Sequence, residues 1–237
     1  MLQIKNLVKS FPGGARAVDN VSLHVAPGDI YGFIGHNGAG KTTTIKCVTG
    51  LYDFDEGEIY VDGKSVKEDP MACKMVSAYI PDNPDLYDHL TCMQYLNFIA
   101  DIYRIPKEPR AEKIKYYADI LELSSRLGEP IGAFSHGMKQ KVAIIAALLH
   151  EPKLLVLDEP FVGLDPKAAH IVKQLLADMC QKGGAVFFSS HVLEVVEKLC
   201  NKIAIIKKGK IIVSGLTEDI LKDESLEDLF LELTDNE

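Results

Sequence analysis

The sequence lacks the cysteine patterns of disulfide-rich and zinc-binding proteins. Its 237 residues include five cysteines, an odd number, and no two of them form a CxxC pair. This spacing argues against a disulfide framework and against a clustered zinc site. We therefore expect reduced core thiols in a cytoplasmic protein, at Cys47, Cys73, Cys92, Cys180 and Cys200.

Three further absences narrow the class of protein. No apolar run reaches the roughly 18 residues that a membrane-spanning helix needs, and the start, MLQIKNLVKSF, lacks the basic-then-apolar layout of a signal peptide. Positive charge is scarce: 26 Lys and Arg face 34 Asp and Glu, giving a net charge of −8, which argues against nucleic-acid binding. The basic run at residues 207–210 is expected to be a hairpin turn between strands 203–206 and 211–213.

The composition and length are typical of an α/β protein. Hydrophobic residues make up 47% of the chain and charged residues 25%, enough for a core and a soluble surface. The length allows one α/β domain with an inserted subdomain, or two small lobes. Alternating apolar and polar residues over 2–8 and 18–25 predict two antiparallel strands joined at Pro12-Gly13-Gly14. Residues 58–62 and 75–80 are expected to be further strands.

Helical and strand patterns alternate along the rest of the chain. Residues 90–127 predict a helical insert, broken into at least two helices at Ile105-Pro106 and Glu108-Pro109. Uninterrupted apolar runs at 154–157 and 185–188 lie between helical stretches, and this arrangement indicates a parallel sheet covered on both faces. The helical stretches flanking these runs cover 135–150 and 166–181, and the acidic amphipathic tail, 218–233, predicts one or two small helices.

Residues 35–42, GHNGAGKT, match the phosphate-binding loop pattern. Apolar residues 30–34 precede the loop and 43–48 follow it, which gives the strand, turn and helix that the pattern requires. Peptide N–H groups at a helix N-terminus can surround phosphate oxygens, Lys41 can reach the β- and γ-phosphates, and Thr42 can bind Mg²⁺. The loop therefore predicts a nucleoside triphosphate site made by Gly35, His36, Asn37, Gly38, Ala39, Gly40, Lys41, Thr42 and Thr43.

Two acids and a histidine follow buried strands. Asp158 and Glu159 end the run LLVLDEP, at the strand end where ligands gather in open α/β sheets. Asp158 would hold Mg²⁺, and Glu159 would polarise the attacking water as a general base. His191 could bond the γ-phosphate or orient that water. Two alternatives remain open. The acids could cap the next turn, and His191 could have a purely structural role.

These motifs occur in a fixed order that resembles the nucleotide-binding subunit of an ABC transporter over residues 1–215. FSHGMKQ at 134–140 matches the family signature, Gly163 to Asp165 match its GLD loop, and His191 its switch histidine. MKQK at 138–141, LYDHLT at 86–91 and LEDLFLELT at 226–234 are similar to multidrug, polyketide or antibiotic exporter ATPases.

The resemblance implies a RecA-like α/β fold within one ABC-type domain. A mostly parallel core with an antiparallel β subdomain would span 1–85 and 151–215. A helical subdomain with the signature would span 86–150, and a short tail 216–237.

The resemblance also implies a head-to-tail dimer with ATP between one phosphate loop and the other subunit's signature. Ser135 and the backbone of Gly137 would then meet a γ-phosphate in trans, and Asp165 would lie at the dimer seam. Phe11 would stack on adenine with Val18 beside it. A plain helix cap for Ser135 and a core position for Phe11 are the alternatives.

Three residues depart from the family pattern. Asp82 stands where the family has glutamine, so it could touch Mg²⁺ directly or through water with a shorter side chain. His136 replaces the first glycine of the signature, and Phe161 stands where a small polar residue is usual.

The sequence thus predicts an ATPase, peripheral on the inner face of the cell membrane, that powers a separate multi-spanning subunit in export. It would act as a homodimer or a heterodimer. Leu86, Tyr87 and Tyr95 are candidates for the membrane-subunit contact, and packing in the core of the helical insert is the alternative for them. The rivals are weaker. An SMC-like ATPase would need long coiled coils, a translation-factor ATPase carries two such domains, and a kinase would leave FSHGMKQ and His191 unexplained.

Overall fold

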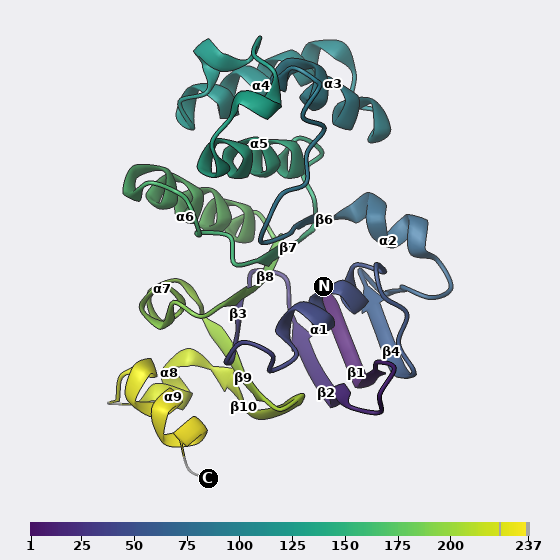
Figure 1. Cartoon of the computed structure of the whole chain (residues 1–237), viewed down its shortest axis with the longest axis vertical. Helices are drawn as coiled ribbons and strands as arrows, with labels where there is room; N and C mark the ends of the chain where they lie inside the picture. The colour runs from purple at the N-terminus through teal and green to yellow at the C-terminus, as the bar shows by residue number, and fades with distance from the viewer. Residues whose placement is uncertain (223, 236–237) are drawn as a thin grey trace.

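The computed structural model describes residues 1–222 and 224–235, arranged in two sheets with helices around them (Figure 1). The smaller sheet has the order β2-β1-β4-β5, and the larger one has the order β10-β9-β3-β8-β7-β6. The predicted α/β class is confirmed. Residues 223, 236 and 237 of the predicted tail lie outside the described residues.

The smaller sheet is antiparallel. Its strands are β1 (Leu2–Ser10), β2 (Arg16–Val25), β4 (Glu56–Val61) and β5 (Lys64–Ser65). β1 pairs with β2 from Leu2 opposite Val25, as the alternation of apolar and polar residues predicted. Alternate side chains such as Leu2 and Ile4 are buried, because successive residues of a strand point to opposite faces.

The larger sheet is mostly parallel and carries the apolar runs. It contains β3 (Ile30–Ile34), β6 (Ser77–Ile80), β7 (Leu154–Asp158), β8 (Ala185–Ser190), β9 (Lys202–Lys207) and β10 (Lys210–Leu216). The first five run parallel, and β10 returns antiparallel to β9 through the predicted basic hairpin turn.

Both faces of this sheet are buried, as its uninterrupted apolar strands predicted. Side chains alternate between two cores along each strand. Leu155 and Phe188 pack with the helices on one face, whereas Val156 and Phe187 pack with β1 and β2 on the other.

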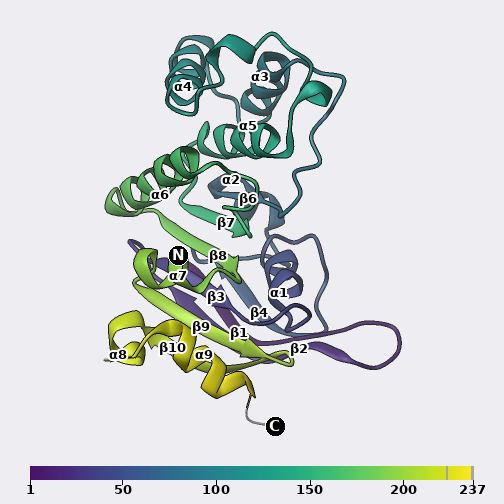
Figure 2. The same ribbon diagram turned by 60° about the vertical axis from the view of Figure 1, so that its left-hand side comes forward.

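The helices occupy distinct regions of the molecule (Figures 1 and 2). α3 (Cys92–Ile102), α4 (Lys107–Ile120) and α5 (His136–Leu148) gather at one end. α8 (Thr217–Leu221) and α9 (Leu226–Asp235) lie at the opposite end, beside β9 and β10. The remaining helices are α1 (Lys41–Val48), α2 (Pro70–Val76), α6 (Pro166–Gln181) and α7 (Leu193–Leu199).

Two local predictions were wrong. The strand expected at 75–80 begins only at Ser77, because Met75 and Val76 complete α2. The expected break at Glu108-Pro109 is absent: Pro109 lies in the first turn of α4, where its missing N–H would have no helical partner in any case. The break at Ile105-Pro106 is confirmed, with Pro106 at the N-cap of α4.

The five cysteines are buried and free, as their spacing predicted. Among the described residues, no helix combines the length and the apolar character needed to cross a bilayer.

Candidate active site

Three parallel strands bring distant motifs to one edge of the larger sheet. β3 pairs with β8, and β8 pairs with β7, so that Ile34 lies opposite Ser190 and Asp158 opposite Ser189. The residues that follow these strands therefore emerge together, although more than a hundred positions separate the first motif from the others. Ligands collect at such carboxyl ends in open α/β sheets.

The phosphate-binding loop has the predicted strand, turn and helix, and its glycines cannot be replaced without strain. Gly40 has φ +112°, and a Cβ there would lie 2.4 Å from the carbonyl oxygen of Ala17. A Cβ on Gly35 would come equally close, 2.4 Å, to the carbonyl oxygen of Ile206. The tight turn lets α1 begin at Lys41 with its N-terminal amides directed at the loop.

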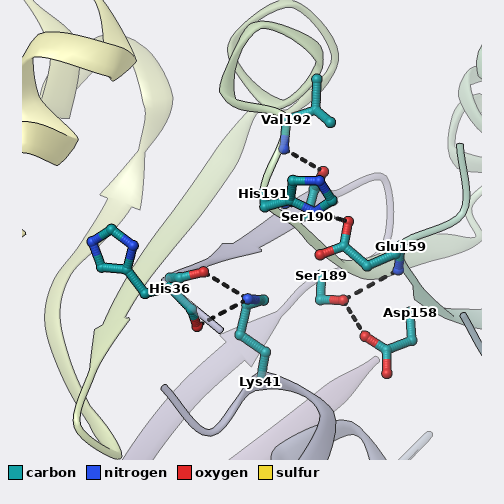
Figure 3. A network of polar contacts seen from close by, with 9 residues as sticks. His36, Lys41, Asp158, Glu159, Ser189, Ser190, His191 and Val192 are labelled. Atoms are coloured by element: carbon teal, nitrogen blue, oxygen red, sulfur yellow. Dashed lines mark hydrogen bonds and ion pairs between the residues drawn. The ribbon is translucent and has the colours of Figure 1, made fainter. Parts of the chain in front are cut away.

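Lys41 lies inside this loop with only 7% of its surface exposed. Its ammonium group donates to the carbonyl oxygens of Gly35 at 2.6 Å and His36 at 3.3 Å (Figure 3). Burial lowers the pKa of Lys41, while the nearby carboxylates of Glu159 and Asp158 act in the opposite direction. The side chain is thus a partly desolvated cation near two acids. Such a cation forms strong charge-assisted hydrogen bonds with a phosphate group.

Ser189 joins the two acids and was missed as a site residue by the sequence analysis. Its hydroxyl donates to Asp158 Oδ1, and its Oγ accepts from the backbone N–H of Glu159 at 3.3 Å. The only sequence signal for it was its place before His191 at the end of an apolar strand. Asp158 is 3% exposed, so this hydroxyl satisfies one oxygen of a buried carboxylate.

Glu159 has an unusual backbone conformation, and its carboxylate contacts His191. Its φ is +50°, in the left-handed region that a non-glycine residue rarely adopts. Its Oε2 accepts from the backbone N–H of His191 at 3.3 Å and lies 2.9 Å from His191 Nδ1 (Figure 3). Strain of this kind clusters at functional sites, where the surroundings fix one orientation.

A cavity of about 220 Å³ lies between these groups. Three predicted acids, Asp82, Asp158 and Glu159, border it opposite the phosphate loop. The loop residues that line it are His36, Asn37, Gly38, Gly40, Lys41, Thr42 and Thr43.

Other predicted site residues do not line this cavity. The Ser135 hydroxyl accepts from the backbone N–H of Met138 at 3.3 Å and caps α5, and Asp165 caps α6. A Cβ on Gly137 would lie 2.3 Å from the carbonyl oxygen of Gly163. The signature and the GLD loop are therefore packed closely against each other, away from this chain's own phosphate loop.

His136 contacts this same loop. A Cβ on Gly163 would lie 2.4 Å from His136 Cδ2, so the imidazole covers the glycine. The ring that departs from the family pattern therefore has a packing partner within the chain.

Of the two residues predicted to contact adenine, only Phe11 is accessible. Its ring is 41% exposed and lies edge-on to Tyr52 with centroids 5.7 Å apart. Val18 is fully buried among the core side chains of the smaller sheet. The structure therefore leaves Phe11 as the exposed member of this pair, with Val18 packed in the core.

Comparisons with known protein families and sequences identify the same kind of nucleotide-binding protein. A family profile described as ABC transporter matches residues 18–162. The ABC-type transporter ATP-binding protein EcsA from Bacillus subtilis (strain 168) is 36% identical over 239 aligned residues, covering 99% of this chain and 96% of EcsA. The chain belongs to the ABC transporter family. It is an ATP-binding subunit with ATPase activity.

Two further matches support the same assignment. The linearmycin resistance ATP-binding protein LnrL from the same organism is 35% identical over 223 residues, or 93% of this chain and 70% of LnrL. A solved structure described as the ATP binding subunit of an ABC transporter has a TM-score of 0.95 at 33% identity and covers 99% of both chains. The RecA-like α/β fold predicted from the resemblance is confirmed.

The residues of this ABC subunit fit a magnesium ion bound together with nucleotide. Thr42, Asp82 and Asp158 border one cavity and offer the oxygen ligands that Mg²⁺ prefers. No group of three or more His, Cys, Asp or Glu side chains within residues 1–222 and 224–235 could hold a metal by itself. Mg²⁺ commonly uses one or two carboxylates and completes its shell with phosphates and water.

Replacing Asp82 tests its predicted metal contact. We expect Asp82→Ala to lower the ATPase rate at limiting Mg²⁺ by about tenfold, or about 1.4 kcal/mol of barrier, while ATP affinity changes less than about threefold because the loop contacts remain. Asp82→Gln, the residue usual in the family, should retain most activity.

The measurement is a Mg²⁺ titration of ATPase activity together with calorimetry of ATP binding. Asp85→Ala is the matched control, because Asp85 is an exposed acid in the same segment that does not line the cavity. An Asp82→Ala enzyme with the wild-type Mg²⁺ dependence would rule out the metal contact.

Proposed function

We propose that this ABC subunit closes head to tail with a second ATP-binding subunit around two ATP molecules and drives export through a separate membrane-spanning subunit. The main observation behind this proposal is that the predicted site residues fall into two groups at separate places on the chain. The cavity holds Lys41 and Glu159, whereas Ser135 and Asp165 lie outside it. A site whose complementary half lies elsewhere on the same chain is completed by a second copy or a related subunit.

Each of the two groups of residues has a proposed role in binding ATP. Lys41 and the loop amides bind the β- and γ-phosphates, and Phe11 stacks on the base. Ser135 and Gly137 of the opposite subunit present a hydroxyl and a positive helix end to the γ-phosphate, because α5 begins at this point. Thr42, Asp158 and Asp82 would hold Mg²⁺, which would neutralise part of the phosphate charge.

The hydrolytic step is assigned to Glu159. Its carboxylate accepts the proton of the attacking water as that oxygen approaches the γ-phosphorus, and the bond to ADP breaks. The backbone N–H of His191 donates to Oε2, and the ring Nδ1 lies 2.9 Å from the same oxygen; these two contacts orient the carboxylate. Loss of the γ-phosphate removes the group that bridges the two subunits, so that the dimer opens.

Export is the direction that the relatives support best. LnrL is named a linearmycin resistance protein, and this chain aligns with it over 93% of its length. Peripheral attachment at the inner face of the membrane follows from that role.

Of the residues predicted to contact the membrane subunit, Tyr87 has the accessible surface. Leu86 is 9% exposed, whereas Tyr87 is 51% exposed and lies edge-on to Phe98 with centroids 5.7 Å apart. Phe98 is itself 42% exposed, and Tyr95 lies 6.2 Å from Tyr87 between centroids. Exposed aromatic side chains in a group are typical anchors of protein interfaces. We assign the contact with the membrane subunit to Tyr87 and Phe98. The less exposed Leu86 and Tyr95 would pack beneath them.

Recovery of the membrane subunit tests the proposal. Tagged protein purified from detergent-solubilised membranes of the source organism should carry an intact multi-spanning protein. We expect Tyr87→Glu to reduce its recovery by at least about tenfold, since an unpaired charge buried in an interface costs several kcal/mol. ATP binding should be unchanged.

Tyr116→Glu is the control, because Tyr116 is 56% exposed on α4 and is not part of the Tyr87 group. Equal recovery with both variants would place the contact elsewhere. Wild-type protein that carries no multi-spanning partner would contradict the transport function itself.

A further inference from the structure

The C-terminal helix contacts the phosphate-binding loop. The ring of Phe230 in α9 lies 4.8 Å from the ring of His36 between centroids, at an interplanar angle of 57°. His36 is the second residue of the loop, and its carbonyl oxygen accepts from the Lys41 ammonium. Its ring points away from Lys41 (Figure 3). One residue of the loop thus contacts the phosphate-binding lysine through its backbone and the tail through its side chain.

Phe230 is fixed from several sides. It is 8% exposed, and Leu226, one helical turn before it on the same face, is fully buried. The backbone N–H of Leu226 donates to Glu197 Oε2 of α7 at 2.9 Å, and the Lys207 ammonium of β9 donates to the carbonyl oxygen of Leu233 at 3.4 Å. α9 is therefore attached both to α7 and to the end of β9.

The same ring lines a small cavity that also reaches His191. This cavity of about 160 Å³ is lined by Gly35, His36, Asn37, His191, Leu193 and Phe230. α7 begins at Leu193, two residues after His191. Phe230 therefore lies where the phosphate loop and the segment that carries His191 face each other.

We propose that Phe230 is a positioning residue for ATP hydrolysis. Its ring sets the spacing between the phosphate loop at His36 and the His191 segment, and so keeps His191 on the Glu159 carboxylate. The inference rests on the proposed role of Glu159 and His191. Lys41 also donates to the carbonyl oxygen of Gly35 at 2.6 Å, a contact that does not involve His36, so loss of Phe230 should affect turnover more than ATP binding.

Steady-state kinetics of the full chain provide the first test. We expect Phe230→Ala to lower kcat about fivefold and to leave KM for ATP within about twofold, since small misplacement of catalytic groups slows the chemical step. Phe230→Leu keeps most of the apolar volume and should fold if the alanine variant does not, with a loss of about threefold. Phe230→Tyr, which retains the ring, should restore kcat.

Leu231→Ala is the control, because Leu231 is the next residue of α9 and is 46% exposed. It should have wild-type kinetics. A Phe230→Ala or Phe230→Leu variant with reduced thermal stability and an unchanged kcat would limit Phe230 to packing and overturn the proposal.

Histidine NMR signals provide a readout that does not depend on catalysis. We expect Phe230→Ala to shift the imidazole signals of both His36 and His191, the first by loss of the ring contact and the second by displacement of its segment. A shift confined to His36 would overturn the coupling. If His191→Ala hydrolyses ATP normally, the proposed role of His191 fails, and the NMR result still decides whether Phe230 couples the two segments.

Discussion

Glu159→Gln is expected to bind ATP normally and to hydrolyse it at least about a hundredfold more slowly, the scale of a lost general base. The amide keeps the shape of the side chain but cannot accept the proton of the attacking water. In the structure the carboxylate is already oriented for this task, with Oε2 2.9 Å from His191 Nδ1. The same substitution should trap an ATP-bound dimer, because the bridging γ-phosphate is no longer removed.

Phosphate release and gel filtration in the presence of ATP measure these two effects. Glu194→Gln is the matched control, because Glu194 is an exposed glutamate in the adjacent helix α7, paired with Lys198 at 2.8 Å. It should keep wild-type hydrolysis and show no trapped dimer. If Glu159→Gln hydrolyses ATP at the wild-type rate, another group must act as the base.

Lys41→Ala is expected to weaken ATP binding by at least about a hundredfold, or about 2.7 kcal/mol. Charge-assisted hydrogen bonds from a partly desolvated ammonium to phosphate oxygens are among the strongest polar contacts in proteins. Lys41 is only 7% exposed, so burial has already removed much of its hydration, and the same burial lowers its pKa. The cation therefore gives up little further hydration when it binds a phosphate.

Calorimetric titration with ATP measures this loss. Lys46→Ala is the control, because Lys46 lies on the same helix α1 but packs over the Tyr52 ring at 5.1 Å. It should bind ATP within about twofold of wild type. Unchanged affinity of Lys41→Ala would mean that the loop does not bind the phosphates of ATP.

Local patterns in the sequence predicted most of the fold and which motif residues line one cavity. Apolar runs without polar interruption predicted strands buried on both faces, and β7 and β8 alternate between two cores as expected. The loop pattern at 35–42 and the acids after β7 predicted which side chains meet at one sheet edge. These predictions succeed because strand direction and loop geometry follow from short stretches of chain.

Tertiary structure decided which side chains are accessible and which pairs touch. Phe11 was expected to stack on adenine with Val18 beside it, and packing leaves Val18 fully buried and Phe11 41% exposed. Ser189 looked like any residue at the end of a strand until β8 paired with β7 and placed its hydroxyl on Asp158. Such roles depend on neighbours contributed by other elements, which no local pattern specifies.

The contact between Phe230 and His36 is the clearest case of this limit. From the sequence alone, Phe230 belongs to the apolar face of a tail helix, and His36 is one of the four positions that the phosphate-loop pattern leaves unspecified. Their rings meet only because β9 carries the chain back beside β3 and α9 then packs on α7. Local propensity and motif spacing thus predicted the residues of the nucleotide site, whereas long-range packing determined which other side chains contact them.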